Sequence, residues 1–332
     1  MSGDFGLLSS PDVRTGYISG TTFQNKPVTY SVVNGRAMFE GCICLGTVEQ
    51  MEQNVARVRA QDQAGIERGV AITGEQFRWP GAVMIYDIDG GLPDQARVTD
   101  AIAHWVANTN IRFVLRTAGN AAQYPHWVRF IPADGCWSEV GMRGGMQQLG
   151  LAAGCSTGNA IHEIGHALGL WHEQSREDRG TFVTINWANI EAGREHNFNQ
   201  HITDGDDVGA YEYGSIMHYG RTAFSSNGLD TIVPTQAGAV IGQRNGLSAG
   251  DIAAIHAIYR TWHYNRRVFQ TFTSHHAQNA WALVEGLGWR KVMDGAGDGV
   301  TNMFDALCEA CAHNQRVSVE ADGAKVYIFY FV

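Results

Sequence analysis

The chain of 332 residues contains no run of lysine and arginine, and its 33 acidic residues outnumber its 24 basic ones, for a net charge of −9. Because nucleic acids and anionic membranes are bound through clustered basic residues, neither partner is expected. No apolar stretch approaches the roughly 18 residues of a membrane span. The first ten residues also lack the basic start and apolar core of a secretory signal.

What is present is typical of a globular protein, with 44% hydrophobic and 17% charged residues. Forty glycines favour an architecture rich in loops and tight turns. The spacing of the six cysteines suggests at least one disulfide, and therefore an oxidising compartment. We expect a secreted protein whose export signal is missing from this chain or replaced by another route.

Residue periodicity predicts an α+β fold. Alternating apolar residues and the turn pair Asn34-Gly35 predict a strand pair over 26–45. Apolar residues at helical spacing predict a helix over 93–108. Ser156 or Thr157 can cap a helix that runs to about Trp171, and a last helix of this domain is expected over roughly 249–260. A polar helix is expected over 47–68, and further strands over 79–86, 111–115 and 127–131. The composition changes after Trp262, so residues 263–332 are expected to form a small α+β module with a helix at 303–313 and strands at 316–320 and 325–331.

The segment from His162 to His172 reads HEIGHALGLWH. Residues four apart lie on one helix face, so His162 and His166 can direct both imidazoles at one metal ion. Gly169 can end the helix with a positive φ and turn the chain back, which brings His172 within reach as a third ligand. This set predicts a single catalytic Zn²⁺, with Glu163 placed to take a proton from a water molecule that the ion activates.

A second pattern, Ser215-Ile216-Met217-His218-Tyr219, follows downstream. The motif HExxHxxGxxH with a later methionine turn is the signature of the metzincin peptidases. It places Met217 beneath the zinc as an apolar floor. The resemblance to this group implies a metzincin catalytic domain with a twisted, mostly parallel sheet, an edge strand, an active-site helix and a glycine-rich C-terminal subdomain.

Four segments resemble the astacin family specifically, and the resemblance covers about residues 70 to 262. They are residues 135–138 (GCWS), 172–179 (HEQSREDR), 183–186 (VTIN) and 215–219 (SIMHY). The resemblance implies that Tyr219 is a further zinc ligand that can move away to hydrogen-bond the reacting carbonyl. It also implies that Glu173 anchors the new N-terminus formed on activation.

The resemblance further implies a substrate-binding rim and one disulfide. Cys136, Trp137 and Ser138 begin an edge strand to which an extended peptide can add by main-chain hydrogen bonds. Cys136 and Cys155 match one of the two disulfides usual in the family, whereas the second is absent. Arg244 resembles a position that shapes the pocket for the residue after the scissile bond, where it would favour Asp or Glu; a solvated loop arginine is the alternative.

Astacins are made as zymogens whose propeptide carries an aspartate, in a Phe-x-Gly-Asp motif, onto the zinc. Here the segment reads Phe39-Glu40-Gly41-Cys42, with cysteine in place of aspartate. Because a thiolate is a good zinc ligand, we expect Cys42 to hold the zymogen inactive as a cysteine switch. A disulfide at Cys42, a buried thiol there, or Cys44 as the true ligand are the alternatives.

Counting back from Trp79, which resembles the tryptophan near the mature N-terminus of the family, places activation close to Arg68-Gly69-Val70. Arg68 suits a trypsin-like activating protease. The expected domains are a propeptide at 1–69, the astacin-like peptidase at 70–262 and the small module at 263–332.

The sequence thus predicts a zinc endopeptidase acting on proteins or peptides. The competing interpretation is a catalytically silent metzincin scaffold that only binds ligands. In the module, Trp281 and Trp289, with His275 and His276, suit either ligand recognition or a small core. Cys308 and Cys311 lie one helical turn apart and can bridge, bind metal or stay reduced.

Overall fold

The computed structural model describes residues 6–18, 26–64, 77–201, 207–274, 279–292, 297–321 and 325–331. The chain divides into two compact units, Met1–Ile255 and His256–Val332. The predicted cleavage site at Arg68–Val70 and the histidines His275 and His276 lie outside the described residues. Within the described ranges, no helix is both long enough and apolar enough to cross a membrane.

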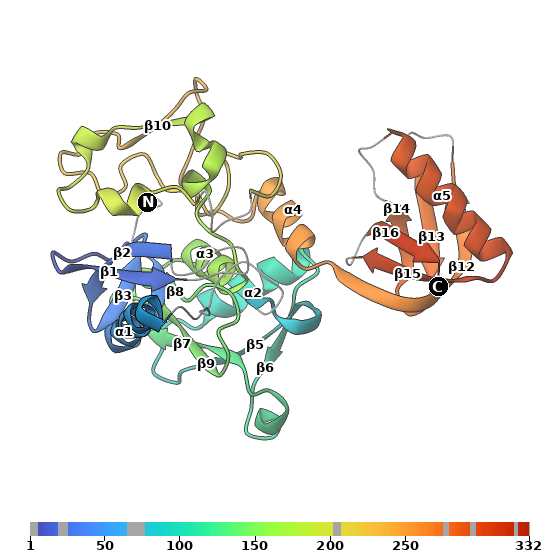
Figure 1. Cartoon of the computed structure of the whole chain (residues 1–332), viewed down its shortest axis with the longest axis horizontal. Helices are drawn as coiled ribbons and strands as arrows, with labels where there is room; N and C mark the ends of the chain where they lie inside the picture. Colours follow the sequence, from blue (N-terminus) through green and yellow to red (C-terminus); the bar gives the residue numbers. More distant parts are fainter. Residues whose placement is uncertain are drawn as a thin grey trace. The chain divides into compact units, whose positions relative to one another are not determined.

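The first unit is built on a nine-stranded sheet with the order β1-β2-β3-β4-β8-β9-β7-β5-β6 (Figure 1). Its strands are β1 (Val13–Ile18), β2 (Lys26–Val33), β3 (Arg36–Phe39), β4 (Ile43–Thr47), β5 (Val83–Ile88), β6 (Arg112–Leu115), β7 (Trp127–Pro132), β8 (Cys136–Ser138) and β9 (Met146–Leu151). Strands β9, β7, β5 and β6 are parallel, and β8 runs antiparallel to β9. The predicted mostly parallel arrangement is confirmed for β9, β7, β5 and β6. The predicted edge strand, β8, is not at an edge of this sheet, because β4 pairs with its other side.

The N-terminal strands extend this sheet beyond β8. Strands β1 to β4 pair antiparallel in sequence order, and β4 then pairs in parallel with β8 through Ile43 and Ser138. The turn predicted at Asn34-Gly35 is present, and both residues have positive φ, as a tight hairpin turn requires. The sequence predicts one strand pair over 26–45; the chain reverses again at Glu40 and Gly41, both at positive φ, so this region holds three strands.

Among the described residues, the first unit contains the helices α1 (Val48–Ala64), α2 (Ala96–Asn108) and α3 (Thr157–Ala167), and most of α4 (Ala249–Ile258). The region between α3 and α4 contains two short paired strands, β10 (Val183–Ile185) and β11 (Ile232–Pro234), and is otherwise mostly loops. Short 3-10 turns occur at Pro80–Ala82, Ala121–Gln123, Glu173–Ser175, Glu177–Thr181, Trp187–Asn189 and Glu195–Phe198. This loop-rich region matches the glycine-rich subdomain expected from the sequence.

Two predicted boundaries move for local reasons. The strand expected from Trp79 starts at Val83, because Pro80 opens a 3-10 turn in which Gly81 has positive φ. Helix α3, expected to continue to about Trp171, ends at Ala167. Gly169 has φ 103°, a conformation that only glycine adopts readily, and it terminates the helix.

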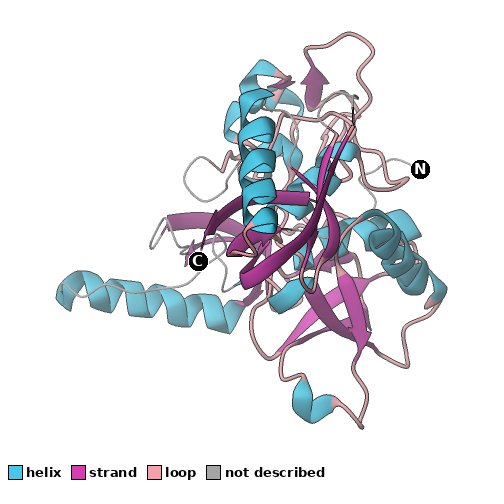
Figure 2. Cartoon of the chain, turned by 90° about the vertical axis from the view of Figure 1, so that its right-hand side faces the viewer, coloured by secondary structure: helices cyan, strands magenta, loops and turns pink. Residues whose placement is uncertain are grey.

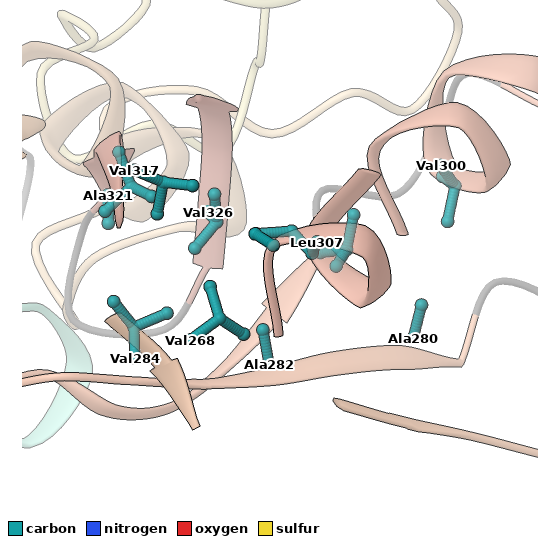
Figure 3. Packing of buried hydrophobic residues seen from close by; sticks show 12 residues of the cluster. Val268, Ala280, Ala282, Val284, Val300, Leu307, Val317, Ala321 and Val326 are labelled. Atoms are coloured by element: carbon teal, nitrogen blue, oxygen red, sulfur yellow. The ribbon is translucent and has the colours of Figure 1, made fainter. Parts of the chain in front are cut away.

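The second unit is a closed five-stranded barrel with the strand order β12-β13-β14-β16-β15. Its strands are labelled in Figure 1 and drawn in magenta in Figure 2. Its elements are β12 (Thr261–Thr273), β13 (Ala280–Val284), β14 (Gly288–Val292), α5 (Gly297–Ala312), β15 (Arg316–Ala321) and β16 (Lys325–Phe331). Small aliphatic side chains from the strands and from α5 form most of its core (Figure 3). The predicted helix and last two strands are present, whereas β12 starts two residues before the expected boundary at 263.

Candidate metal centre

Helix α3 positions the first two predicted ligands. Ser156 is its N-cap: the side chain accepts from the backbone N–H of Asn159, and the Asn159 side chain accepts from the backbone N–H of Ser156. After Ala167 the chain reverses at Gly169, and the N–H of Leu170 donates to the carbonyl of Gly165 over 2.9 Å. This reversal returns the chain to the same helix end, so that His172 faces His162 and His166.

Four buried donor atoms meet at this point. The Sγ atom of Cys42 lies 3.6 Å from Nε2 of His162, 3.4 Å from Nε2 of His166 and 3.1 Å from Nε2 of His172. All four donor atoms lie within 4.8 Å of one another. The segment from residue 39 to 42 therefore brings its cysteine to the three histidines predicted as ligands, and Cys44 does not join them.

The remaining ring nitrogens fix the orientation of each imidazole. Nδ1 of His162 is 2.8 Å from the carbonyl of Ile216, and Nδ1 of His166 is 2.7 Å from the carbonyl of Leu170. Nδ1 of His172 is 2.7 Å from Oε2 of Glu40. Because each Nδ1 faces an acceptor, it carries the proton, and each Nε2 presents a lone pair to the centre. Burial lowers the pKa of all three histidines, which favours the neutral, ligating form.

These distances fit one tetrahedral Zn²⁺. With Zn–N and Zn–S bonds of about 2.05 and 2.3 Å, a tetrahedral ion would hold nitrogen and sulfur about 3.6 Å apart. The observed separations of 3.1 to 3.6 Å lie close to that value. Burial raises the pKa of the Cys42 thiol well above its usual range, so the thiolate needs the positive charge that such an ion supplies.

Glu163 is buried beside the ligands. Its Oε2 atom has no hydrogen-bond partner within the described part of the chain. Burial raises its pKa well above the usual range, although the positive charge of Arg244 opposes this effect. A buried carboxyl oxygen without a hydrogen bond destabilises the fold, and a catalytic role is one explanation for such a group in a native structure. The position suits a group that exchanges a proton with a reacting water.

Met217 lies under α3 at a place where the helix carries no side chain. A Cβ atom built on Gly165 would approach Sδ of Met217 to 2.8 Å, so glycine is needed there for the close contact. Asp251 on α4 holds the turn from below: its carboxylate accepts from Oγ of Ser215 over 2.6 Å and from the N–H of Ile216 over 2.9 Å. No sequence pattern points to Asp251, because it lies in a helix 35 residues away from the turn.

Glu40 is a second residue that sequence reasoning missed. Its fully buried carboxylate accepts from Nδ1 of His172, from Oγ of Ser175 over 2.8 Å and from Nε2 of His201 over 2.8 Å. Burial acts to raise its pKa, but His201 and His172 outweigh this effect and hold the pKa well below its usual range. The hydroxyl of Tyr219, a predicted ligand, donates to the backbone carbonyl of Glu40.

The predicted substrate rim is covered by the N-terminal strands. Cys136, Trp137 and Ser138 form β8, and the N–H of Ser138 donates to the carbonyl of Cys42 over 2.9 Å. The Cys136–Cys155 disulfide is present, with its Cα atoms 6.0 Å apart. Cys44 is a free buried thiol, and Cys308 and Cys311 are also free, so neither Cys42–Cys44 nor Cys308–Cys311 forms a bridge.

The two remaining candidates lie at the edges of the site. Arg244 is half-buried, and its guanidinium donates to the carbonyls of His218 and Gln243 over 3.1 and 2.8 Å. Glu173 accepts from the N–H of Glu212 over 2.8 Å, and burial raises its pKa to about 7. Glu173 also borders a small cavity of about 40 Å³ whose lining includes Glu212 and Asp251.

Comparisons with known proteins agree with this geometry. The family model for the astacin peptidases matches residues 71–260. Zinc metalloproteinase nas-13 of Caenorhabditis elegans is 40% identical over 200 residues, which are 59% of this chain and 43% of that protein. High choriolytic enzyme 1 of Oryzias latipes is 42% identical over 181 residues, which are 53% of this chain and 64% of that protein.

The fold is shared as well. The solved structure of high choriolytic enzyme 1, a hatching enzyme zinc-protease from the medaka fish, has a TM-score of 0.52 at 36% identity and covers 58% of this chain and 98% of that one. This chain spans less than half the length of nas-13. The family match extends over more than half of the 332 residues and includes all three histidines. The chain therefore belongs to the astacin family of metzincin zinc metallopeptidases.

Proposed function

We propose that the chain is a secreted zinc endopeptidase in its zymogen form, kept inactive by Cys42 on the catalytic metal. The observation that carries this proposal is the approach of the Cys42 Sγ atom to within 3.6 Å of Nε2 in all three histidines. A thiolate in that position fills the coordination site that an active zinc peptidase keeps open for water. The Cys136–Cys155 disulfide supports an oxidising compartment.

The reaction follows from the groups around the cluster. When bound, Zn²⁺ supplies a Lewis acid that polarises a carbonyl and makes water a nucleophile at neutral pH. Glu163 takes a proton from that water and passes it to the leaving amine. The hydroxyl of Tyr219 donates a hydrogen bond to the carbonyl oxygen as negative charge develops there. In the zymogen this hydroxyl donates to Glu40 instead, so the propeptide withholds a second catalytic group besides the metal.

Protein or peptide substrates are expected to bind along β8. Strand β4 now pairs with this edge, and it leaves with the rest of residues 1–69 on activation. An extended substrate can then form main-chain hydrogen bonds with Trp137 and Ser138. Arg244 remains a candidate for selecting an acidic residue after the scissile bond, and replacing it with alanine would reduce kcat/KM for such peptides more than for peptides with alanine there.

Activation is proposed to occur by cleavage near Arg68-Gly69-Val70, by a protease of trypsin-like specificity. The new α-amino group would enter the cavity beside Glu173 and pair with its carboxylate. Burial raises the pKa of Glu173 to about 7 even though the guanidinium of Arg176 lies 3.8 Å away. This supports the assignment, because a further cationic partner would favour the charged form of the carboxyl. Glu212 and Asp251 in the cavity lining add acidic groups that would favour a bound cation.

The alternative is a metzincin scaffold that binds ligands without catalysis. The complete set of three histidines and the unsatisfied carboxylate of Glu163 argue against it, since binding alone needs neither.

The deciding experiment is hydrolysis of a labelled protein before and after limited tryptic nicking, with Glu163→Ala as the control. We expect activity only after nicking and none in the control. N-terminal sequencing of the active enzyme should find a start between residues 66 and 73. A zinc-loaded, nicked chain without activity would instead support the binding scaffold.

The cysteine switch needs its own test. Replacing Cys42 with alanine should give measurable hydrolysis in the uncut chain, because water regains the fourth coordination position. Cys44→Ala is the matched control, since it removes a buried thiol that lies outside the cluster. Equal latency in the two variants would show that the propeptide blocks the site by covering it alone.

A further inference from the structure

The C-terminal barrel has a recognisable topology. Numbered within the unit, its five strands are arranged 1-2-3-5-4, the barrel closes between the first and fourth strands, and the third and fifth strands are parallel. The helix α5 lies in sequence between the third and fourth strands. The long first strand pairs with β15 in its first half and with β13 in its second half, with a register shift in each pairing. This is the arrangement of the OB-fold, a five-stranded Greek-key barrel.

In this fold the face formed around the second and third strands binds oligonucleotides and oligosaccharides. The corresponding face here carries aromatic side chains that the core does not use. Phe272 on β12 is 51% exposed and Trp289 on β14 is 43% exposed, and Trp281 on β13 lies half-buried between their strands. Phe272 pairs directly with Trp281, and Trp281 is diagonal to Trp289 across β13 and β14. The three rings thus form a row across three strands.

The inward positions explain why these rings face outward. Ala280, Ala282 and Val284 of β13 point into the barrel core, as Figure 3 shows, and alternate with Trp281 on the opposite face. The sequence leaves open whether Trp281 and Trp289 belong to a core. The structure places both on the outer face, where the indole N–H of Trp281 donates to Oδ1 of Asn279 over 2.8 Å.

A concave site coincides with the row of rings. It has a volume of about 450 Å³ and is lined by Gln270, Thr271, Phe272, Trp281 and Trp289. This volume falls in the range of about 300–1,000 Å³ that small-ligand sites occupy. The lining contains aromatic faces and uncharged polar groups and, among the described residues, no charged side chain. Lys291, which pairs with Trp281, places one basic residue at its border.

The charge of the module helps to decide between the two classes of ligand that such a face binds, oligonucleotides and oligosaccharides. Residues 256–332 contain seven basic and seven acidic side chains, so the module has no excess positive charge to attract a phosphate backbone. Single-stranded nucleic acids need a basic groove in addition to stacking aromatics. Neutral sugars need only flat apolar rings for their C–H faces and uncharged polar groups for their hydroxyls.

We infer that the C-terminal barrel is a carbohydrate-binding module that takes a neutral oligosaccharide across Phe272, Trp281 and Trp289. Successive sugar rings stack on successive aromatic side chains, and the amide of Gln270 hydrogen-bonds a hydroxyl. This binding is independent of peptidase activity, and it would hold the enzyme on glycan-bearing material that contains its protein substrates.

The test is titration of the full chain with cellohexaose, chitohexaose and laminarihexaose, followed by calorimetry and by tryptophan fluorescence. We expect at least one of the three to bind. Trp289→Ala and Phe272→Ala should each raise its Kd at least about tenfold, and Trp289→Phe, which keeps a ring, should raise it less. Trp187→Ala is the matched control, because it removes a tryptophan that is 49% exposed in the first unit.

Thermal melts of every variant establish that the barrel remains folded. The inference is overturned if none of the three hexasaccharides binds, or if binding survives Trp289→Ala and Phe272→Ala in folded protein. Tighter binding of a twelve-nucleotide oligothymidylate than of any of the hexasaccharides, weakened by added salt, would overturn the inference in favour of a nucleic-acid-binding module.

Discussion

At the scale of single residues, the candidate metal centre depends on a close contact between helix α3 and the turn that contains Met217. Gly165 faces Met217 so closely that even a methyl group would meet its sulfur at 2.8 Å. We predict that Gly165→Ala lowers the free energy of unfolding by about 1–3 kcal/mol and weakens zinc binding. Urea unfolding and zinc titration measure the two effects. Gly180→Ala is the control, since nothing lies within 4 Å of a Cβ there; equal effects in both variants would contradict the prediction.

Glu40 allows a second test at this scale. Glutamine has nearly the same shape but lacks the charge and one acceptor, so one of the three donors from His172, Ser175 and His201 loses its partner. Glu40→Gln should destabilise the uncut chain by about 1–3 kcal/mol and accelerate its tryptic activation. The activated enzyme should be unchanged in kcat/KM, because residue 40 has been removed. A mature enzyme that still differs from wild type would refute the assignment of Glu40 to the zymogen alone.

At the scale of elements, α4 supports the turn that contains Met217 although the two are far apart in sequence. Asp251→Asn would keep one oxygen acceptor but lose the negative charge. That charge strengthens the hydrogen bonds that Ser215 and the N–H of Ile216 donate to the carboxylate. We predict a loss of about 1–3 kcal/mol in stability, and reduced zinc retention during dialysis against a weak chelator. Asp305→Asn on α5 provides a matched acid-to-amide control in the other unit. Unchanged zinc retention in Asp251→Asn would show that the turn is held by packing.

Elements that depend on local pattern are predictable from the sequence, and those that depend on distant contacts are not. The start of α3 and the spacing of His162 and His166 follow from capping and helical geometry within a few residues. The bond from Glu40 to His172 joins residues 132 positions apart, which no local pattern encodes. Strand β12 is hard to predict because two register shifts interrupt its alternation. Strand β13 is hard to predict because Trp281 faces outward between apolar neighbours and hides the two-residue period.

At the scale of the whole molecule, all four candidate metal donors belong to the first unit, and the barrel has a core of its own. Zinc that binds only the folded state stabilises the unit that contains its ligands. Calorimetry of the uncut chain should therefore show that EDTA lowers the melting temperature of the first unit and leaves the transition of the barrel unchanged. Restoring zinc should return the first transition. A common shift of both transitions would mean that the units unfold as one.

In the proposed switch, Cys42 belongs to the same chain as the metal site, and this has a consequence for how strongly its thiolate must bind the metal. A tethered ligand is present at its site at an effective concentration of the order of millimolar. A dissociation constant well below that concentration is enough to keep the site filled, so the intrinsic affinity of the ligand can be weak. After cleavage the fragment is diluted into the surrounding medium, and the same weak affinity no longer retains it. The proposed propeptide inhibitor can thus occupy the metal site fully before cleavage and still dissociate afterwards without another protein to remove it. A free peptide copying residues 39–44 should accordingly be only a modest inhibitor of the mature enzyme.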